Sequence, residues 1–225
     1  MTHQVRAFAR GALWALPVWA ALLFYGTLTH QPDVQTDFAG FAAYVTTTEF
    51  LLSHLVASIG GAAIGSIGVI TLMLYLQDSN VAGRSIIGMV AIVAGNTITS
   101  SVFGAAAFAQ TAAGRMFQAG QQNAIEFYNQ VYSGPLFGTV IVGLLLFMVG
   151  SVFTGIAITA SGRMPRWTGW VYAIATVLFV FSGFLFPVGQ SITSALLIVA
   201  TVAVAWSAIR EGERQEVKAQ ISPVP

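Results

Sequence analysis

Long apolar segments alternate with short polar ones along the whole chain. The apolar segments are residues 11–29, 50–76, 85–110, 136–160, 167–186 and 192–209. Each is close to the twenty or so residues that cross ~30 Å of hydrocarbon at about 1.5 Å per residue. Because backbone groups in lipid need partners within their own segment, each is predicted to be an α-helix. The pattern predicts an all-α polytopic membrane protein, a six-helix transmembrane bundle forming one domain over residues 1–210.

The basic residues lie on one side of these segments, at the two ends of the chain and in every second gap. They are Arg6, Arg10, Arg84, Arg163, Arg166, Arg210, Arg214 and Lys218. Only Arg115 falls in the other set of gaps. By the positive-inside rule, both termini are predicted to be cytoplasmic, with residues 211–225 as a polar cytoplasmic tail. A cleaved signal peptide is the alternative for the first segment. Its apolar stretch is longer than the roughly 7–15 residues of a signal h-region, which favours an uncleaved span.

The composition agrees with a membrane protein and narrows the chemistry. Only 8% of the 225 residues are charged, against about 25% in soluble domains, and the mean hydropathy is +0.77. Cysteine is absent, so disulfides, thiolate nucleophiles and Cys-ligated metals are excluded. Basic residues form no patch for a phosphate backbone, and no nucleic-acid partner is expected. No hydrolase elbow, phosphate loop or HExxH motif occurs, so the sequence does not predict an enzyme.

His54 is the ionisable residue that reaches furthest into an apolar segment. It follows the start of the second segment by about one turn, and on a regular helix it shares a face with Ser58, Gly61 and Gly65. Ionisable groups at membrane depth are costly and usually face the protein interior or a water-filled cavity. A structural hydrogen bond is favoured for His54. A proton or ligand site and a metal or haem site are the alternatives.

Glu49 lies five residues before His54, about 140° around a regular helix, so the two meet only if the chain bends between them. If they met, His30 could complete a metal shell, which makes His30, Glu49 and His54 weak metal candidates. Glu49 is also a suitable acidic residue for a helix N-terminus. Haem ligation by two histidines is poorly supported, because His30 lies in a loop, and no cofactor is predicted.

Asn96 and Ser100 share a face at the middle of the third segment. A hydrogen bond to another helix is the favoured role for Asn96, and a contact with a substrate is the alternative. Near the midplane, no segment carries an ionisable residue of the kind that ion-coupled transporters use. Passage of a neutral molecule remains open. Glu49, His54, Asn96 and Ser100 are therefore the candidate ligand-binding residues.

Small residues recur at close-packing spacing on three of the segments. The candidates for helix packing are Gly61, Gly65, Gly95, Gly150 and Gly155. Glycine lets helix backbones approach closely, which is how packing energy is gained in lipid. Packing within one bundle is favoured, and a dimer interface at Gly61–Gly65 is the alternative. Residues 30–49 and 111–134 hold aromatic residues and are predicted to form a cap on the side away from the termini.

The segment Ser161-Gly162-Arg163-Met164-Pro165-Arg166-Trp167-Thr168-Gly169-Trp170 resembles a loop of small bacterial multi-pass membrane proteins whose function is not known. The resemblance covers about ten residues and implies a bacterial cytoplasmic-membrane protein. It supplies no catalytic residues.

Three functional hypotheses follow. The leading one is a non-enzymatic accessory or scaffold subunit of a membrane complex, whose partners are the lipid bilayer and other subunits or further copies of itself. The second is a small permease or channel for a neutral or weakly polar solute, with its polar site on the third helix. The third is a metal- or haem-binding membrane subunit that uses His54.

Overall fold

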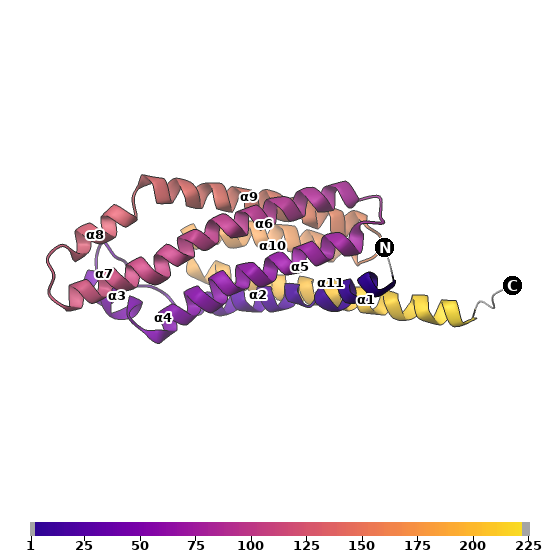
Figure 1. Ribbon diagram of the computed structural model, residues 1–225, viewed down its shortest axis with the longest axis horizontal. Helices are drawn as coiled ribbons and strands as arrows, with labels where there is room; N and C mark the ends of the chain where they lie inside the picture. The colour runs from indigo at the N-terminus through magenta and orange to yellow at the C-terminus, as the bar shows by residue number, and fades with distance from the viewer. Residues whose placement is uncertain (1–2, 222–225) are drawn as a thin grey trace.

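The computed structural model describes residues 3–221, whose regular elements are all helices, without a strand. The helices are α1 His3–Ala12, α2 Ala15–Gly26, α3 Phe38–Val45, α4 Thr48–Leu52, the π-helix η1 Ser53–Gly60, α5 Gly61–Leu76, α6 Ala82–Ala105, the π-helix η2 Ala106–Gln110, α7 Thr111–Gln118, α8 Ala124–Val131, α9 Gly134–Ala160, α10 Arg166–Leu185 and α11 Pro187–Ile221. They form an elongated bundle (Figure 1). Helix α1 and the far end of α11 lie at one end, and α3, α7 and α8 lie at the other.

Among the described residues, five helices are long and apolar enough to cross a membrane. They are Ala7–Gly26, Thr48–Leu76, Ala82–Gln118, Gly134–Ala160 and Val188–Arg214. The protein is therefore an all-helical, multi-pass membrane protein, as predicted. The fifth predicted span, residues 167–186, corresponds to α10 and is not in this set. Two helices extend beyond their predicted spans: the third continues past residue 110 to Gln118, and α11 continues into the polar tail to Ile221.

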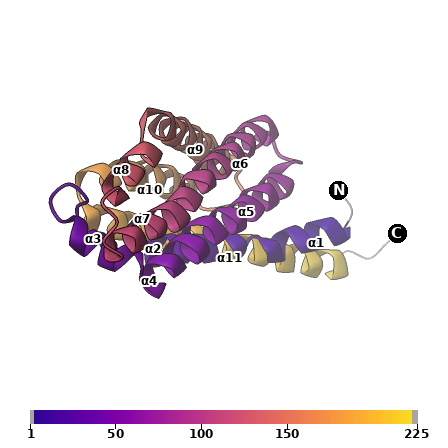
Figure 2. The same ribbon diagram turned by 60° about the vertical axis from the view of Figure 1, so that its left-hand side comes forward.

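The helices form a closed ring. In chain order, α2 packs against α5, α5 against α6, α6 against α9, α9 against α10 and α10 against α11. Helix α11 then returns to pack against α2, which closes the ring (Figure 2). Short connections reverse the chain between neighbours. For example, α9 ends at Ala160 just before Gly162, whose φ of +68° suits glycine, and Pro187 opens α11 directly after α10.

Helices α6 and α9 approach most closely at glycines. A Cβ atom added at Gly95 would lie 2.7 Å from the backbone nitrogen of Phe147, and one added at Gly150 would lie 2.6 Å from that of Ile92. Because backbone cannot move aside as a flexible side chain can, only glycine fits at these two positions. The close approach maximises van der Waals contact between helices where lipid offers no hydrophobic drive.

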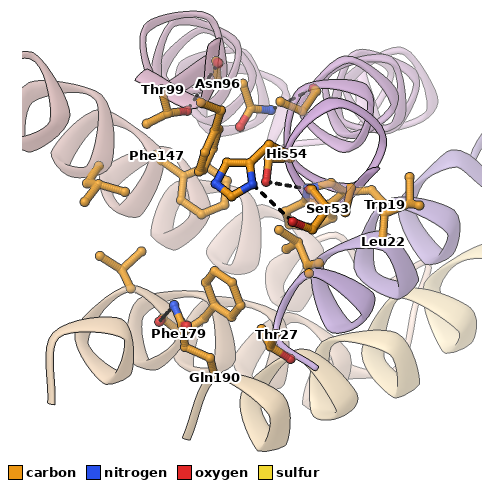
Figure 3. A pocket seen from close by; sticks show the side chains of 18 residues that line it. Trp19, Leu22, Thr27, Ser53, His54, Asn96, Thr99, Phe147, Phe179 and Gln190 are labelled. Carbon is orange, nitrogen blue, oxygen red and sulfur yellow. Dashed lines mark hydrogen bonds between the residues drawn. The ribbon is translucent and has the colours of Figure 1, made fainter. Parts of the chain in front are cut away.

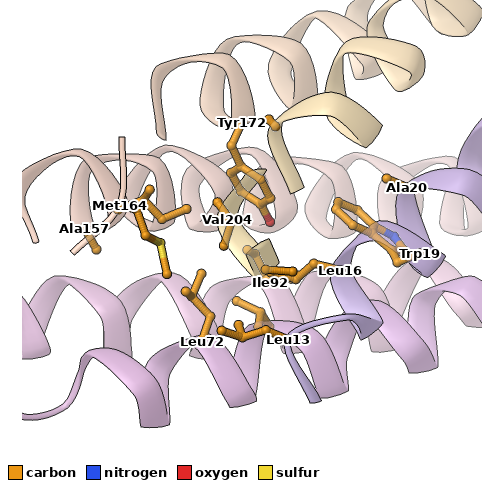
Figure 4. Close-up of a cluster of buried hydrophobic side chains, with 14 of the residues drawn as sticks. Leu13, Leu16, Trp19, Ala20, Leu72, Ile92, Ala157, Met164, Tyr172 and Val204 are labelled. Atoms are coloured by element: carbon orange, nitrogen blue, oxygen red, sulfur yellow. The ribbon is translucent and has the colours of Figure 1, made fainter. Parts of the chain in front are cut away.

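Trp19 is buried at one side of the core cluster (Figure 4). Its ring meets Phe147 edge-on at 6.0 Å and Tyr172 at a tilt at 6.3 Å. A Cβ at Gly65 would lie 2.8 Å from the indole, so the glycine of α5 makes room for the ring. The side chain of α2 thus joins α5, α9 and α10.

Polar contacts tie the bundle together at the end where α1 lies. The Tyr75 hydroxyl donates a hydrogen bond to Glu211 on α11. The guanidinium of Arg163, in the α9–α10 turn, donates to the Tyr75 carbonyl oxygen and lies 5.4 Å from the centre of its ring. One tyrosine therefore links α5 to α11 and to the turn before α10.

We expect Gly95→Ala to lower the free energy of unfolding by about 1–3 kcal/mol, because its Cβ would press on the Phe147 backbone. Gly104→Ala is the matched control on the same helix, since a Cβ there meets no atom within 4 Å. The control should be neutral or stabilising by up to about 1 kcal/mol. Unfolding of both variants in detergent would measure this. Equal effects would contradict the close α6–α9 crossing.

Candidate functional site

A cavity of about 240 Å³ lies among the helices next to Trp19 (Figure 3). It lies toward the end of the bundle that holds α3, α7 and α8 (Figure 1). Residues of α2, η1, α5, α6, α9, α10 and α11 form its wall. Trp19 and Phe147 close it toward the core. Two residues that the sequence singled out, His54 and Asn96, line the same cavity. They come from helices that neighbour each other in the ring.

The π-helix η1 determines where His54 points. The Gly61 N–H bonds the carbonyl of Val56, five residues back, where an α-helix bonds four residues back. Each π turn takes about one more residue than an α turn, so the face of His54 rotates relative to α5. As a result, His54 and Ser58 line the cavity together with Ala62. Gly61 and Gly65 instead face α2, where Cβ atoms would meet Leu22 and Trp19.

The prediction that His54, Ser58, Gly61 and Gly65 share one face was therefore wrong, because it assumed a regular α-helix. The Gly61–Gly65 stripe packs within the bundle against α2. Of the other predicted packing glycines, Gly155 lies against α10, where a Cβ would come 2.6 Å from that of Ala173. Gly95 and Gly150 lie at the α6–α9 crossing described above.

The hydrogen bonds of His54 define its tautomer. Its Nδ1 lies 3.0 Å from the Phe50 carbonyl oxygen and 3.1 Å from Ser53 Oγ. A carbonyl oxygen only accepts, so Nδ1 carries the hydrogen, and neutral His54 has its lone pair on Nε2. No described residue bonds Nε2. Figure 3 shows the imidazole directed into the cavity.

Asn96 links α6 to α5. Its Nδ2 donates to the carbonyl oxygen of Ala62 at 3.2 Å and to Ser66 Oγ at 3.1 Å. The side chain is buried, and both amide hydrogens are used by these bonds. This is the interhelical hydrogen bond favoured by the sequence. Asn96 lines the cavity, and its amide oxygen, Oδ1, takes no part in these two bonds.

The other predicted site residues lie elsewhere. Glu49 and His30 are exposed, and Ser100 is half-buried outside the cavity wall. Among the described residues, no group of three His, Asp or Glu side chains could hold a metal ion. The three metal candidates, His30, Glu49 and His54, are therefore not brought together as a metal site.

Residues 30–49 and 111–134 pack on each other at the end of the bundle opposite α1, which confirms the predicted cap. Helix α3 packs against α7, and α7 packs against α8. Asp37 caps the start of α3, where its carboxylate accepts from the Gly40 N–H at 2.8 Å. Phe50 connects the cap to the site: its ring lies 5.6 Å from that of Tyr44 and 4.2 Å from the imidazole of His54.

Polar contacts join the two segments of the cap to each other and to η2. Thr111 of α7 donates to the Val45 carbonyl oxygen at 2.9 Å, and Gln110 Nε2 of η2 donates to the Tyr132 hydroxyl oxygen at 2.7 Å. Tyr132 stacks on Tyr128 at 4.6 Å. Burial raises the pKa of Tyr132, and more modestly that of Tyr128, because the phenolate would be poorly solvated there.

Two further polar residues line the wall: Thr27, which the sequence does not single out, and Gln190, for which a role in the turn was favoured over a place at a cavity. The Thr27 hydroxyl donates to the Phe24 carbonyl and lies 3.0 Å from Ser191 Oγ, which joins α2 to α11. Gln190 Nε2 donates to the Phe179 carbonyl oxygen at 3.4 Å. These residues lie at helix ends, where polar residues are ordinary. Only the closure of the ring brings them to the cavity.

The chain matches no known family model, no curated protein and no solved structure. A function for this protein is therefore proposed from the geometry of the cavity.

We expect Asn96→Ala and Ser66→Ala to be coupled in a double-mutant cycle of unfolding free energies. One interhelical hydrogen bond in a membrane protein is worth about 0.5–2 kcal/mol, and the coupling should fall in that range. Thr71→Ala is the matched control, since this α5 hydroxyl bonds only its own helix, at Ile67. Additive effects of Asn96→Ala and Ser66→Ala would contradict the α5–α6 link.

Proposed function

We propose that this protein is an integral membrane protein that binds a small uncharged molecule inside its helix bundle. The observation that carries the proposal is the shared cavity of His54 and Asn96. Its volume, about 240 Å³, lies just below the ~300–1,000 Å³ of drug-sized ligand sites. A mostly apolar wall with a few directed polar groups is typical of such sites. The cavity favours a protein that binds a small molecule, with His54 and Asn96 in the wall, over an accessory or scaffold subunit.

The ligand is proposed to be uncharged because of the composition of the wall. Among the described residues that line the cavity, none is Asp, Glu, Lys or Arg, and His54 is the titratable one. A charged solute would lose its hydration there without gaining a counter-ion.

Binding is better supported than passage. Toward α1, the cavity ends at Trp19 and Phe147, and the packed core continues beyond them to Leu16 and Ile92. A solute could cross the bundle only if Trp19 moved. Permease or channel activity therefore needs a second arrangement of the core, whereas binding needs only the arrangement described.

The stripe proposed for a partner gives the scaffold hypothesis no support. Gly61 and Gly65 already face Leu22 and Trp19 of α2. A partner helix at this stripe would have to displace α2. Attachment to other subunits or to a second copy through another surface remains a prediction.

We further propose that α10 also spans the membrane, which gives six spans. It packs between α9 and α11, which are both candidate spans, and its twenty residues extend about 30 Å. With six spans, Arg84, Arg163 and Arg166 lie at the same end as α1, and Arg115 lies at the cap end. By the positive-inside rule, we propose that the protein lies in a cytoplasmic membrane with its α1 end facing the cytoplasm.

We expect toluene to raise the melting temperature of the wild-type protein in detergent, since a ligand that binds only the folded state stabilises it. Leu144→Trp, which fills the cavity wall, should abolish the response. Ile141→Trp is the matched control, because it adds the same ring on the exposed side of α9. No response of the wild type, or equal responses of all three proteins, would refute binding in the cavity.

The orientation can be measured directly, because the chain has no cysteine. Asn80 and Gln121 are exposed and lie in turns at opposite ends of the bundle. In right-side-out membrane vesicles, an impermeant maleimide should label Gln121→Cys. It should label Asn80→Cys only after permeabilisation. The reverse pattern would overturn the orientation, and labelling of both without permeabilisation would overturn the six-span arrangement.

A further inference from the structure

Most polar hydrogens of the cavity wall are already engaged in hydrogen bonds within the protein. The hydroxyls of Ser53, Ser58 and Thr99 donate to carbonyl oxygens of their own helices, at Phe50, Ser53 and Gly95. In lipid, a hydroxyl satisfies itself in this way because no water competes for the bond. Each of these oxygens still has acceptor capacity, but none has a hydrogen left to offer a ligand.

The two larger polar side chains follow the same rule. Nδ1–H of His54 is held by the Phe50 carbonyl and Ser53 Oγ, which leaves the Nε2 lone pair for the cavity. Both amide hydrogens of Asn96 are held by Ala62 and Ser66, which leaves Oδ1. Each side chain thus presents an acceptor and no donor.

Donors on the wall are few. Gln190 uses one amide hydrogen on Phe179 and keeps the other. The indole of Trp19, which carries one N–H donor, also lines the cavity. Acceptors therefore dominate, and His54 Nε2 is the strongest of them because an imidazole nitrogen is a good base.

The apolar part of the wall combines four aromatic rings with aliphatic side chains such as Leu144 and Val180. The rings are those of Trp19, Phe103, Phe147 and Phe179, and Phe103 meets the imidazole of His54 edge-on at 6.4 Å. Four rings around one cavity favour a ligand ring that can stack or pack edge-to-face on them.

From this count of donors and acceptors we infer that the ligand is a small neutral aromatic molecule carrying a hydroxyl or N–H group, which donates a hydrogen bond to His54 Nε2. This inference rests on the proposed function and adds the chemical class of the ligand. A ligand that can only accept hydrogen bonds would leave the imidazole lone pair unpaired and would bind more weakly.

The test compares three probes of similar size: toluene, p-cresol and 4-methylanisole. The cresol hydroxyl donates, the ether oxygen only accepts, and toluene does neither. Each probe is titrated into the full-length protein in lipid nanodiscs, and the heat from empty nanodiscs is subtracted. We expect p-cresol to bind the wild type about three- to tenfold more tightly than 4-methylanisole, the effect of one net hydrogen bond.

His54→Phe keeps an aromatic ring and removes the acceptor. In this variant the affinities for p-cresol and 4-methylanisole should become equal, and comparing two probes on one variant needs no assumption about its affinity for toluene. If the variant fails to fold, the comparison of p-cresol with 4-methylanisole on the wild type still tests whether the ligand donates a hydrogen bond.

The outcomes separate the two proposals. If none of the three probes binds the wild type, the proposed function fails, and the inference fails with it. If the probes bind but the ether equals or exceeds the cresol, the cavity is a binding site and the donor inference alone is overturned. If the preference for cresol survives in His54→Phe, another acceptor is responsible, and the assignment to His54 is overturned.

Discussion

The packing of Trp19 on Gly65 is the contact on which the rest of the bundle depends. The indole of α2 fills the centre of a ring of helices and touches Phe147 and Tyr172 on the far side. Aromatic rings of this size contribute more buried area than any aliphatic side chain, and here one ring joins four helices. Where its packing ends, the helices no longer fill the space between them, and the cavity begins.

A second constraint is the absence of water from the hydrocarbon region. Polar side chains there turn back on their own helices, as Thr71, Thr176 and Thr201 do by donating to carbonyls four residues earlier. The same bonding pattern occurs along the cavity, where it leaves oxygens and one nitrogen as hydrogen-bond acceptors for a bound molecule. The chemistry of the site is thus a by-product of how helices keep themselves satisfied in lipid.

Much of the architecture could be predicted from periodicity alone, because span length, basic loops and small residues each have a direct physical cause. Gly95 and Gly150 lie at the α6–α9 crossing, and the cap forms from the two predicted segments. Less of the candidate site could be predicted from the sequence. Asn96 stands out as a polar residue in an apolar run, but Gln190 reaches the cavity only because α11 closes the ring, a contact between residues distant in sequence. The prediction that Gly61 shares a helix face with His54 was wrong because no local sequence pattern indicates a π-helix.

That π-helix is in effect a one-residue insertion absorbed within a continuous helix. Everything before it is wound out of phase with everything after it by about 100°, the angle of a single α-helical residue. A conversion of η1 to regular α-helix would therefore act as a rotary joint. The imidazole of His54 would swing from the cavity toward lipid or a neighbouring helix, while α5, with its contacts to α2 and α6, stayed in place.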